Sequence, residues 1–297
     1  MSAPTPPQPA DRPEPGVHPD HDRGLEFDVR TLLARRSALG LIGGAGLFAL
    51  VGCAADGTSG AAASTSPSAT TSSSSATASA SASAAATVDA EVPDETGGPY
   101  PGDGSNGPNV LDDSGIVRQD ISSSFGSSTT SAAGVPLTVN LTVTDGANGY
   151  AAMEGAAVYL WHADAQGRYS MYSQGVEDEN YLRGVQPTGA DGTATFTTVF
   201  PGCYDGRWPH LHFEVYRSTA EATSTGQIVK TSQIALPQAA CEAVYADTST
   251  YPQSTANLAR TSLTGDNVFG DDGGIHQLAT VTGDASSGYV ANLTIGV

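Results

Sequence analysis

The chain has 297 residues, a length that suits one large β domain or two small domains. Its formal net charge is −19, with 12 Lys and Arg residues against 31 Asp and Glu residues. This balance argues against a nucleic-acid-binding protein, because neutralising phosphates requires clustered Lys and Arg. Charged residues make up only 14% and cysteines number three, which excludes a coiled coil and a disulfide-rich scaffold.

The first 52 residues have the features of an export signal. A pair of arginines at 35–36 precedes an apolar run at 38–51, which is too short for a stable membrane span but typical of a signal peptide. The arginine pair indicates twin-arginine export. Small residues just before Cys53 resemble a lipoprotein cleavage site. We therefore expect Cys53 to carry lipid, with an ordinary signal peptide and an incidental cysteine as the alternative.

Residues 53–88 are interpreted as a flexible tether that begins at the lipidated cysteine. The segment from 54 to 87 is almost entirely Ala, Ser, Thr and Gly, and such a stretch cannot bury enough apolar surface to offset its ordering entropy. An alanine-rich helix is the alternative. We expect an exported protein that is lipid-anchored at the outer face of the cell membrane or secreted, with its folded domain at 89–297.

The domain at 89–297 alternates short apolar runs with turn signals. Apolar and polar residues alternate with a period of two across 137–144, which predicts a half-buried strand. No segment of ten or more residues has a helical period. This pattern predicts an all-β fold, a β-sandwich of two mixed sheets. Further strands are predicted at 156–162, 193–199, 210–217, 227–236, 276–282 and 289–296.

Cys203 and Cys241 are the two cysteines of the predicted domain. Outside the cytoplasm a pair of cysteines favours a disulfide, so we expect a bridge between them. Two buried, reduced thiols are the alternative. The spacing offers no CxxC motif for a redox or metal-binding role.

The densest cluster of reactive side chains has the sequence CYDGRWPHLHF at 203–213. His210 and His212 are two residues apart on a predicted strand, so both imidazoles leave one face and could chelate one metal ion. The pair alone is a weak signal, because a polar strand face would look the same. Tyr204 lies in the turn just upstream, and Tyr169 follows a strand and a turn built around Gly167.

Two phenols and two imidazoles together indicate which metal would bind. A trivalent cation lowers the phenol pKa from its usual value of about 10 far enough for the phenolate to bind. This donor set suits ferric iron and suits zinc or calcium poorly. The sequence therefore predicts a metal site on the loops of the sandwich. The alternative for each tyrosine is a half-buried aromatic ring with a satisfied hydroxyl.

Several motifs resemble those of the intradiol ring-cleavage dioxygenases of the secreted or surface-attached type, and they occur in the same order along the chain as in that family. The resemblance covers roughly residues 92–297 and implies a β-sandwich with a mononuclear non-haem Fe(III). It also implies that O₂ opens a catechol ring between the two hydroxyl-bearing carbons to give a muconate-type diacid. The motifs are ETGGPY at 95–100, WHADAQGRY at 161–169, LRGVQPT at 182–188, PGCY at 201–204, GR at 206–207 and HLHF at 210–213.

The resemblance assigns a role to each candidate ligand. Tyr169 and His210 would be equatorial ligands of the iron, and Tyr204 and His212 would be axial ligands. Tyr204 would also be catalytic, because it would leave the metal and accept a proton from the substrate. The segment between Tyr204 and His210 is short, which predicts a more open pocket than in the cytosolic catechol dioxygenases.

Three further residues complete the implied pocket. Arg207 would be catalytic by stabilising negative charge on the substrate, which agrees with the general use of a fixed cation where anionic charge develops. Gln233 would line the substrate pocket. Trp208 would either shape the pocket or cover the core.

The expected function is Fe(III)-dependent cleavage of a catechol-type ring with O₂, and the oligomeric state stays open. The alternative is a lipid-tethered, non-catalytic β-sandwich module that binds an aromatic or carbohydrate ligand. Asp164 and Glu214 are interpreted either as hydrogen-bond partners of the histidines or as a turn carboxylate and a solvent-facing strand residue. His162 is expected to be a pocket wall or a hydrogen-bonded histidine.

Overall fold

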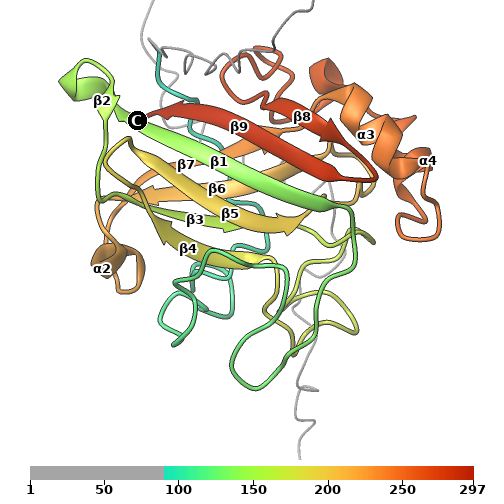
Figure 1. Ribbon diagram of the computed structural model, residues 1–297, viewed down its shortest axis with the longest axis horizontal. Helices are drawn as coiled ribbons and strands as arrows, with labels where there is room; N and C mark the ends of the chain where they lie inside the picture. Colours follow the sequence, from blue (N-terminus) through green and yellow to red (C-terminus); the bar gives the residue numbers. More distant parts are fainter. Residues whose placement is uncertain (1–89) are drawn as a thin grey trace, which may run out of the picture.

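The computed structural model describes residues 90–297. The predicted signal peptide at 1–52, the lipidation at Cys53 and the tether at 53–88 lie outside the described residues. Two β-sheets stack on each other, with long loops at one end and short helices at another side (Figure 1). Within residues 90–297, no helix combines the length and apolar character needed to cross a membrane.

The first sheet contains five strands and is mixed. The long strand β1 (Pro136–Asp145) pairs in parallel with β9 (Gly288–Gly296), and antiparallel with β5 (Thr193–Val199) and the short β2 (Ala151–Ala152). β8 (Thr280–Asp284) is antiparallel to β9 and forms the opposite edge. Residues of β1 alternate between buried and partly exposed, which agrees with the half-buried strand predicted at 137–144.

The second sheet has the strand order β4-β3-β6-β7. Neighbouring strands are antiparallel, and isolated parallel bridges join 117 to 185 and 235 to 278 at its two edges. Mixed pairing is thus confirmed within the first sheet, whereas in the second it is confined to these bridges. The strands are β4 (Arg183–Pro187), β3 (Ala157–Trp161), β6 (His210–Tyr216) and β7 (Ile228–Ala235).

Apolar side chains from both sheets fill the space between them. This core includes Leu141 and Phe196 of the first sheet and Leu160, Phe213 and Ile234 of the second. The opposite face of the second sheet packs against a separate apolar cluster, to which the loop at 110–116 contributes. All seven residues of β6 are therefore buried, although their sequence alternates polar and apolar types.

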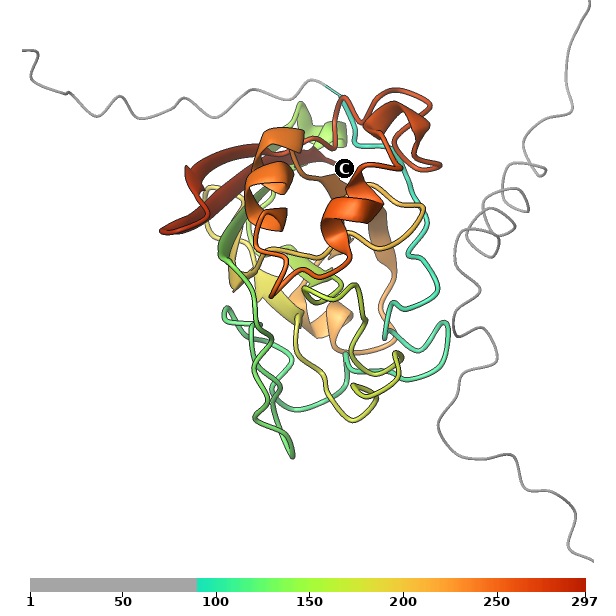
Figure 2. The same ribbon diagram turned by 90° about the vertical axis from the view of Figure 1, so that its right-hand side faces the viewer.

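Short helices and turns complete the domain. α3 (Gln238–Tyr245) and α4 (Ser254–Leu258) lie beside each other next to one end of the sandwich (Figure 2). α2 (Thr219–Ala222) follows β6 directly. Two short 3₁₀ turns, η1 (Gly146–Asn148) and η2 (Leu263–Gly265), begin at the side chains of Asp145 and Ser262.

The strand predictions agree with the structure except in three places. The run predicted at 276–282 begins as a strand only at Thr280, and neither the two-residue β2 nor β4 was predicted. β4 has the sequence RGVQP, whose glycine and proline give no strand signal. Neighbouring strands impose its extended conformation, because β4 pairs along its whole length with β3.

The predicted disulfide is wrong for this structure. Cys203 and Cys241 are both free thiols, buried in the core between the sheets. Each thiol lies within reach of a backbone carbonyl instead, Cys203 near that of Arg207 and Cys241 near that of Leu236. Burial raises the pKa of the Cys203 thiol to about 12, so the uncharged form is favoured.

Candidate metal centre

Four side chains of the second sheet lie in one row that crosses its strands. Trp161 of β3 lies opposite Arg183 of β4 on one side and His212 of β6 on the other, and His212 lies opposite Gln233 of β7. The indole of Trp161 stacks on the imidazole of His212 with centroids 5.0 Å apart and an interplanar angle of 9°. His210 precedes His212 on the same face, as the sequence predicted.

The four predicted ligands converge on one point. Tyr204 Oη is 3.1 Å from His210 Nε2, which is 3.1 Å from His212 Nε2. Tyr169 Oη completes the ring, at 3.1 Å from His212 Nε2 and 3.4 Å from Tyr204 Oη. Metal–nitrogen bonds of about 2.0–2.1 Å place neighbouring donors of one ion about 3 Å apart, so these separations fit a shared metal.

The protonation of the two histidines suits metal binding. His210 Nδ1–H donates to the carbonyl of Trp208 at 2.5 Å, which leaves Nε2 with a lone pair facing the other donors. His212 Nδ1 is buried without a hydrogen-bond partner. Burial, together with the nearby positive charge of Arg207, lowers the pKa of both imidazoles well below the usual value, so both are neutral.

The turn that carries Tyr169 is organised by Asp164. Its carboxylate accepts hydrogen bonds from the backbone N–H groups of Gln166 and Arg168, from Arg168 Nε and from the hydroxyl of Tyr181. The Arg168–Asp164 ion pair closes this turn at 2.8 Å. Asp164 thus fixes the backbone that leads into Tyr169, and none of these hydrogen bonds involves a histidine.

The two tyrosine-bearing turns pack directly on each other. The N–H of Gly202 donates to the carbonyl of Asp164 at 3.0 Å, and a Cβ at Gly202 would come within 2.6 Å of the carbonyl oxygen of Ala165. Gly167 has φ +80°, and a Cβ there would lie 3.0 Å from Cβ of Tyr204. Glycine at both positions is therefore what allows the two phenols to approach one another.

Helix α4 holds the turn that carries Tyr204. The hydroxyl of Ser254 accepts a hydrogen bond from the N–H of Cys203, and the amide of Asn257 donates to the carbonyl of Cys203. All of these groups are buried. The backbone immediately before Tyr204 is thus held on both sides, which restricts where the phenol can point.

Arg207 is almost completely buried and is held by two partners. Its Nε donates to Asp266 Oδ2 at 3.0 Å, and a terminal nitrogen donates to Gln233 Oε1 at 2.6 Å. Asp266 also accepts from the N–H groups of Trp208, Val268 and Phe269. The guanidinium therefore has a fixed orientation beside the four converging donors.

A cavity of about 350 Å³ lies beside these donors and has an apolar, aromatic lining. Three of the predicted ligands line it together with Arg207; His210 is not part of its wall. Gln233 was predicted to line the pocket, and Trp208 either to shape it or to cover the core; neither residue lies on its wall. Gln233 acts behind Arg207, and Trp208 donates its indole N–H to Leu236 and packs into an apolar cluster. The wall is completed by Gly97, Gly98, Pro99, Tyr100, Trp161, Gly167, Ser173, Asp205 and Gly206.

The remaining polar candidates have structural partners. Glu214 accepts a hydrogen bond from the hydroxyl of Tyr216 at 2.7 Å, so it is neither solvent-facing nor a partner of a histidine. Burial raises the pKa of its carboxyl to about 7. His162 is hydrogen-bonded to Thr198 and to the carbonyl of Ala163, which is one of the two alternatives predicted for it.

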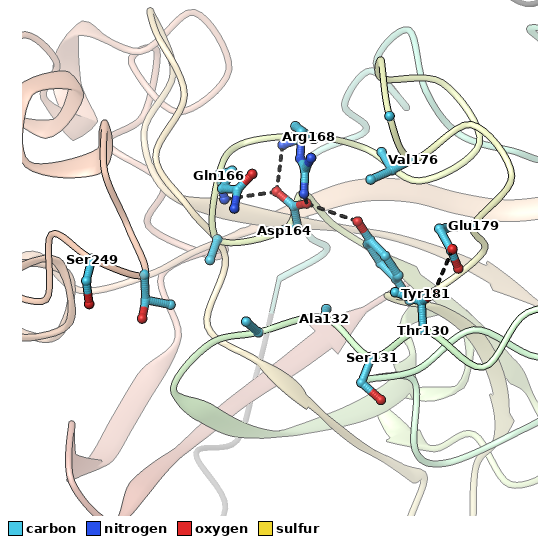
Figure 3. Close-up of a pocket in the computed structure, with 14 residues that line it drawn as sticks. Thr130, Ser131, Ala132, Asp164, Gln166, Arg168, Val176, Glu179, Tyr181 and Ser249 are labelled. Carbon is cyan, nitrogen blue, oxygen red and sulfur yellow. Dashed lines mark hydrogen bonds and ion pairs between the residues drawn. The ribbon is translucent and has the colours of Figure 1, made fainter.

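A second cavity, of about 390 Å³, lies on the other side of the 164–168 turn (Figure 3). Figure 3 shows the Asp164 carboxylate bonded to Arg168 and Tyr181, with Glu179 and Thr130 paired nearby. Its lining is mostly polar, and none of the four converging donors contributes to it. The turn therefore separates a polar cavity from the aromatic one.

The donor set in the aromatic cavity fits a ferric ion. In residues 90–297 no group of three or more His, Cys, Asp and Glu residues forms a metal site, so zinc- and calcium-type sets are not found there. The converging donors are two neutral imidazoles and two phenols. Phenolate oxygens are hard, anionic donors that favour a highly charged cation.

Four functional residues were missed by sequence reasoning. Asp266 is the buried partner of Arg207, but no sequence motif indicates it. Ser254 and Asn257 lie in a short helix with no distinctive pattern. Tyr100 belongs to the ETGGPY motif, but nothing in the sequence places it against Tyr169, from which its ring centroid is 5.2 Å away. All four depend on long-range contacts.

Comparisons with known proteins agree with this geometry. Residues 107–228, which contain all four converging donors and Arg207, match the Dioxygenase family. Catechol 1,2-dioxygenase 1 of Acinetobacter lwoffii is 34% identical over 109 residues, a match that covers 30% of this chain and 34% of that protein. The chain thus spans about a third of the length of this curated relative.

A solved structure extends the similarity to most of the described domain. The intradiol ring-cleavage dioxygenase from the spider mite Tetranychus urticae superposes with a TM-score of 0.55 and 25% identity. The superposition covers 70% of this chain and 94% of that one. The domain is thus similar in sequence to the Dioxygenase family and in fold to an intradiol ring-cleavage dioxygenase.

Proposed function

We propose that this domain is a ferric-iron-dependent intradiol dioxygenase, which cleaves the ring of a catechol-type substrate with O₂ to a muconate-type diacid. The observation that carries the proposal is the ring of Tyr169, Tyr204, His210 and His212 donor atoms, 3.1–3.4 Å apart, beside an aromatic cavity. A non-catalytic binding module would have no need for these four donors to converge.

The four side chains would hold the metal with balanced charge. Two phenolates and two neutral imidazoles contribute two negative charges, which offset most of the charge of Fe(III). When bound, ferric iron would chelate both oxygens of a catecholate and make its ring reactive toward O₂. The fixed tautomer of His210 presents its Nε2 lone pair without rearrangement.

Tyr204 is placed to move a proton. Its side chain is less buried than that of Tyr169, it lines the cavity, and its hydroxyl reaches His210 at 3.1 Å. A phenolate at Tyr204 can accept the proton that a catechol hydroxyl loses on binding. Tyr169 lies deeper and contacts the ring of Tyr100, so it keeps its place during this transfer.

Arg207 stabilises negative charge that develops on the substrate. Arg207 lines the cavity, and Asp266 and Gln233 fix the orientation of its guanidinium, so little reorganisation is needed during the reaction. The Trp161–His212 stack and the 97–100 segment form flat walls that suit a planar aromatic ring.

The test is oxygen consumption with product identification. The purified protein, loaded with Fe(III), is expected to consume one O₂ per catechol and to incorporate both atoms of ¹⁸O₂ into the diacid. Tyr204→Phe should lower kcat/KM by about 100-fold or more, because a general base typically contributes 10²–10⁴. Iron bound without oxygen uptake on catechol, hydroxyquinol or protocatechuate would contradict the proposal.

We also propose export and lipid anchoring through Cys53, on the basis of the sequence at 35–53. Stable anchoring needs more than one acyl chain, which a lipidated cysteine can supply. Full-length protein should therefore fractionate with membranes, and Cys53→Ser should release it. Membrane association that persists in Cys53→Ser would contradict lipid anchoring at this residue.

A further inference from the structure

Arg183 ends the row of side chains that runs through Trp161 and His212. Its side chain is 1% exposed, and all five of its N–H groups donate to uncharged oxygens. The acceptors are Ser170 Oγ at 3.1 Å, Ser170 O at 2.9 Å, Tyr159 Oη at 3.1 Å, Pro101 O at 2.8 Å and Tyr100 O at 3.0 Å.

Three of these acceptor residues lie at or directly beside two walls of the aromatic cavity: Tyr100 lines it, and Pro101 and Ser170 each follow a lining residue. Ser170 directly follows the predicted ligand Tyr169, and Tyr100 lines the cavity on the facing segment. The rings of Tyr100 and Tyr169 are in contact, with centroids 5.2 Å apart. The guanidinium therefore bonds the backbone of both walls at once, while it does not line the cavity itself.

Only arginine can make this connection. Its planar group presents five donors in a rigid fork, whereas lysine offers three donors from one point. Without the fork, the carbonyls of Tyr100, Pro101 and Ser170 each lose a hydrogen bond, which is most costly for the buried carbonyls of Pro101 and Ser170. A cation–π contact with Tyr172 also holds the guanidinium, whose central carbon lies 5.4 Å from the centroid of that ring.

We propose that Arg183 is a positioning residue, which holds the Tyr100 wall against the Tyr169 wall and so sets the width of the substrate slot. Nothing in this role requires contact with substrate or metal. The expected effect on catalysis rests on the proposed function. The effect of Arg183 on the stability of the 97–104 segment can be measured in the metal-free protein.

The test compares Arg183→Met and Arg183→Lys with Arg118→Met. Arg118 is a matched control, because its guanidinium also donates to backbone carbonyls, those of Arg183, Ser123 and Asn180, and does not line the cavity. Two quantities are measured: kcat/KM for catechol in the iron-loaded protein, and amide hydrogen exchange of the 97–104 segment in the metal-free protein.

Both Arg183 variants should lower kcat/KM by about 10- to 100-fold, the scale expected for misplacement by about 1 Å. They should also speed exchange at 97–104, and Arg118→Met should change neither quantity. Equal changes in Arg118→Met, full recovery in Arg183→Lys, or unchanged exchange in Arg183→Met would overturn the proposal.

A milder variant keeps the test decisive if the Arg183 variants do not fold. Ser170→Ala removes only the acceptor of Arg183 Nε and the bond from Ser170 Oγ to the carbonyl of Tyr181. It should speed exchange at 97–104 to a smaller extent, and unchanged exchange would overturn the proposal. If wild-type protein lacks ring cleavage, the proposed function fails, while the exchange data still decide the role of Arg183.

Discussion

The two sheets of the sandwich use polar residues in opposite ways. In the first sheet, the outward positions of β1 are Thr138, Asn140 and Thr142, which are partly exposed. In the second sheet, the corresponding polar positions of β6 are His210, His212 and Glu214, and each is at most 3% exposed. A strand with alternating polarity can therefore face water or carry a buried site, depending on what covers it.

The cover of the second sheet explains why its polar residues have specific partners. Loops that include 110–116 and 163–172 form a second apolar layer over this face, so each buried polar group needs a hydrogen bond. The first sheet needs no such partners, since water satisfies its outer face. Substitutions in the second sheet should thus have large and specific effects, and those in the first sheet small ones.

The largest effect is expected from His210→Ala. The variant removes one of the four converging donors and the Nδ1–H bond to Trp208. Bound iron should be lost and kcat/KM should fall by more than about 1,000-fold, since metal-site residues act as a unit. Metal analysis and oxygen uptake measure both. Thr195→Val on the outer face is the control, and iron retained in full by His210→Ala would refute the ligand assignment.

Asp266→Asn should weaken the orientation of Arg207 without removing the metal. The neutral amide keeps the shape but loses the charge that Arg207 and three backbone N–H groups face. Breaking a buried ion pair costs about 3–5 kcal/mol of stability, and we expect kcat to fall about 10- to 100-fold. Denaturant unfolding and iron-loaded kinetics test this. Loss of iron with unchanged kcat per bound iron would contradict it.

The pH dependence of stability should reflect His162, which links the two sheets through Thr198 of β5. Burial lowers the pKa of His162 from 6.5 to about 4, so the unfolded state binds this proton more tightly. Its contribution is fully present above pH 6.5 and is lost as the pH falls through 4, with a limit of about 3 kcal/mol.

His162→Gln is the variant that isolates this contribution. It should show a smaller loss of stability between pH 6.5 and 4 than the wild-type protein, measured by denaturant unfolding of the metal-free domain. Parallel curves for the two proteins would show that His162 does not titrate in this range.

The smallest effect is expected from Asn140→Ala on the outer face of the first sheet. Asn140 bonds Asn292 on one side and Thr195 on the other, but all three groups are accessible to water. The free energy of unfolding should fall by no more than about 1 kcal/mol, and iron content should not change. A larger loss, measured by denaturant unfolding, would show that this face is as tightly specified as the buried one.

How much the sequence predicts differs between the strands and the loops. Seven strands follow from alternation and turn signals, and His210 and His212 share a face because they lie two residues apart on one of them. The convergence of Tyr169 and Tyr204 on these histidines came from the family resemblance. Its physical causes, the glycine contact at 202 and the Asp164 turn, join segments about 40 residues apart.

The errors have a common physical origin in long-range partners. Gln233 is close to the site in strand register, but Arg207 binds its side-chain oxygen and it does not line the cavity. Trp208 packs into an apolar cluster, which is one of the two roles predicted for it. Asp266 could not be paired with Arg207, because 59 residues separate them and neither flanking sequence signals burial. Local patterns specify which face a side chain leaves, and tertiary packing decides what it meets there.

The most direct test of the central claim is an absorbance spectrum of the purified domain at 90–297 with its iron content, before and after anaerobic addition of catechol. We expect about one iron per chain, a visible tyrosinate-to-iron band, and a shift of that band when catechol binds. A protein that stays colourless and iron-free after reconstitution with ferric iron would contradict the Tyr/His metal centre.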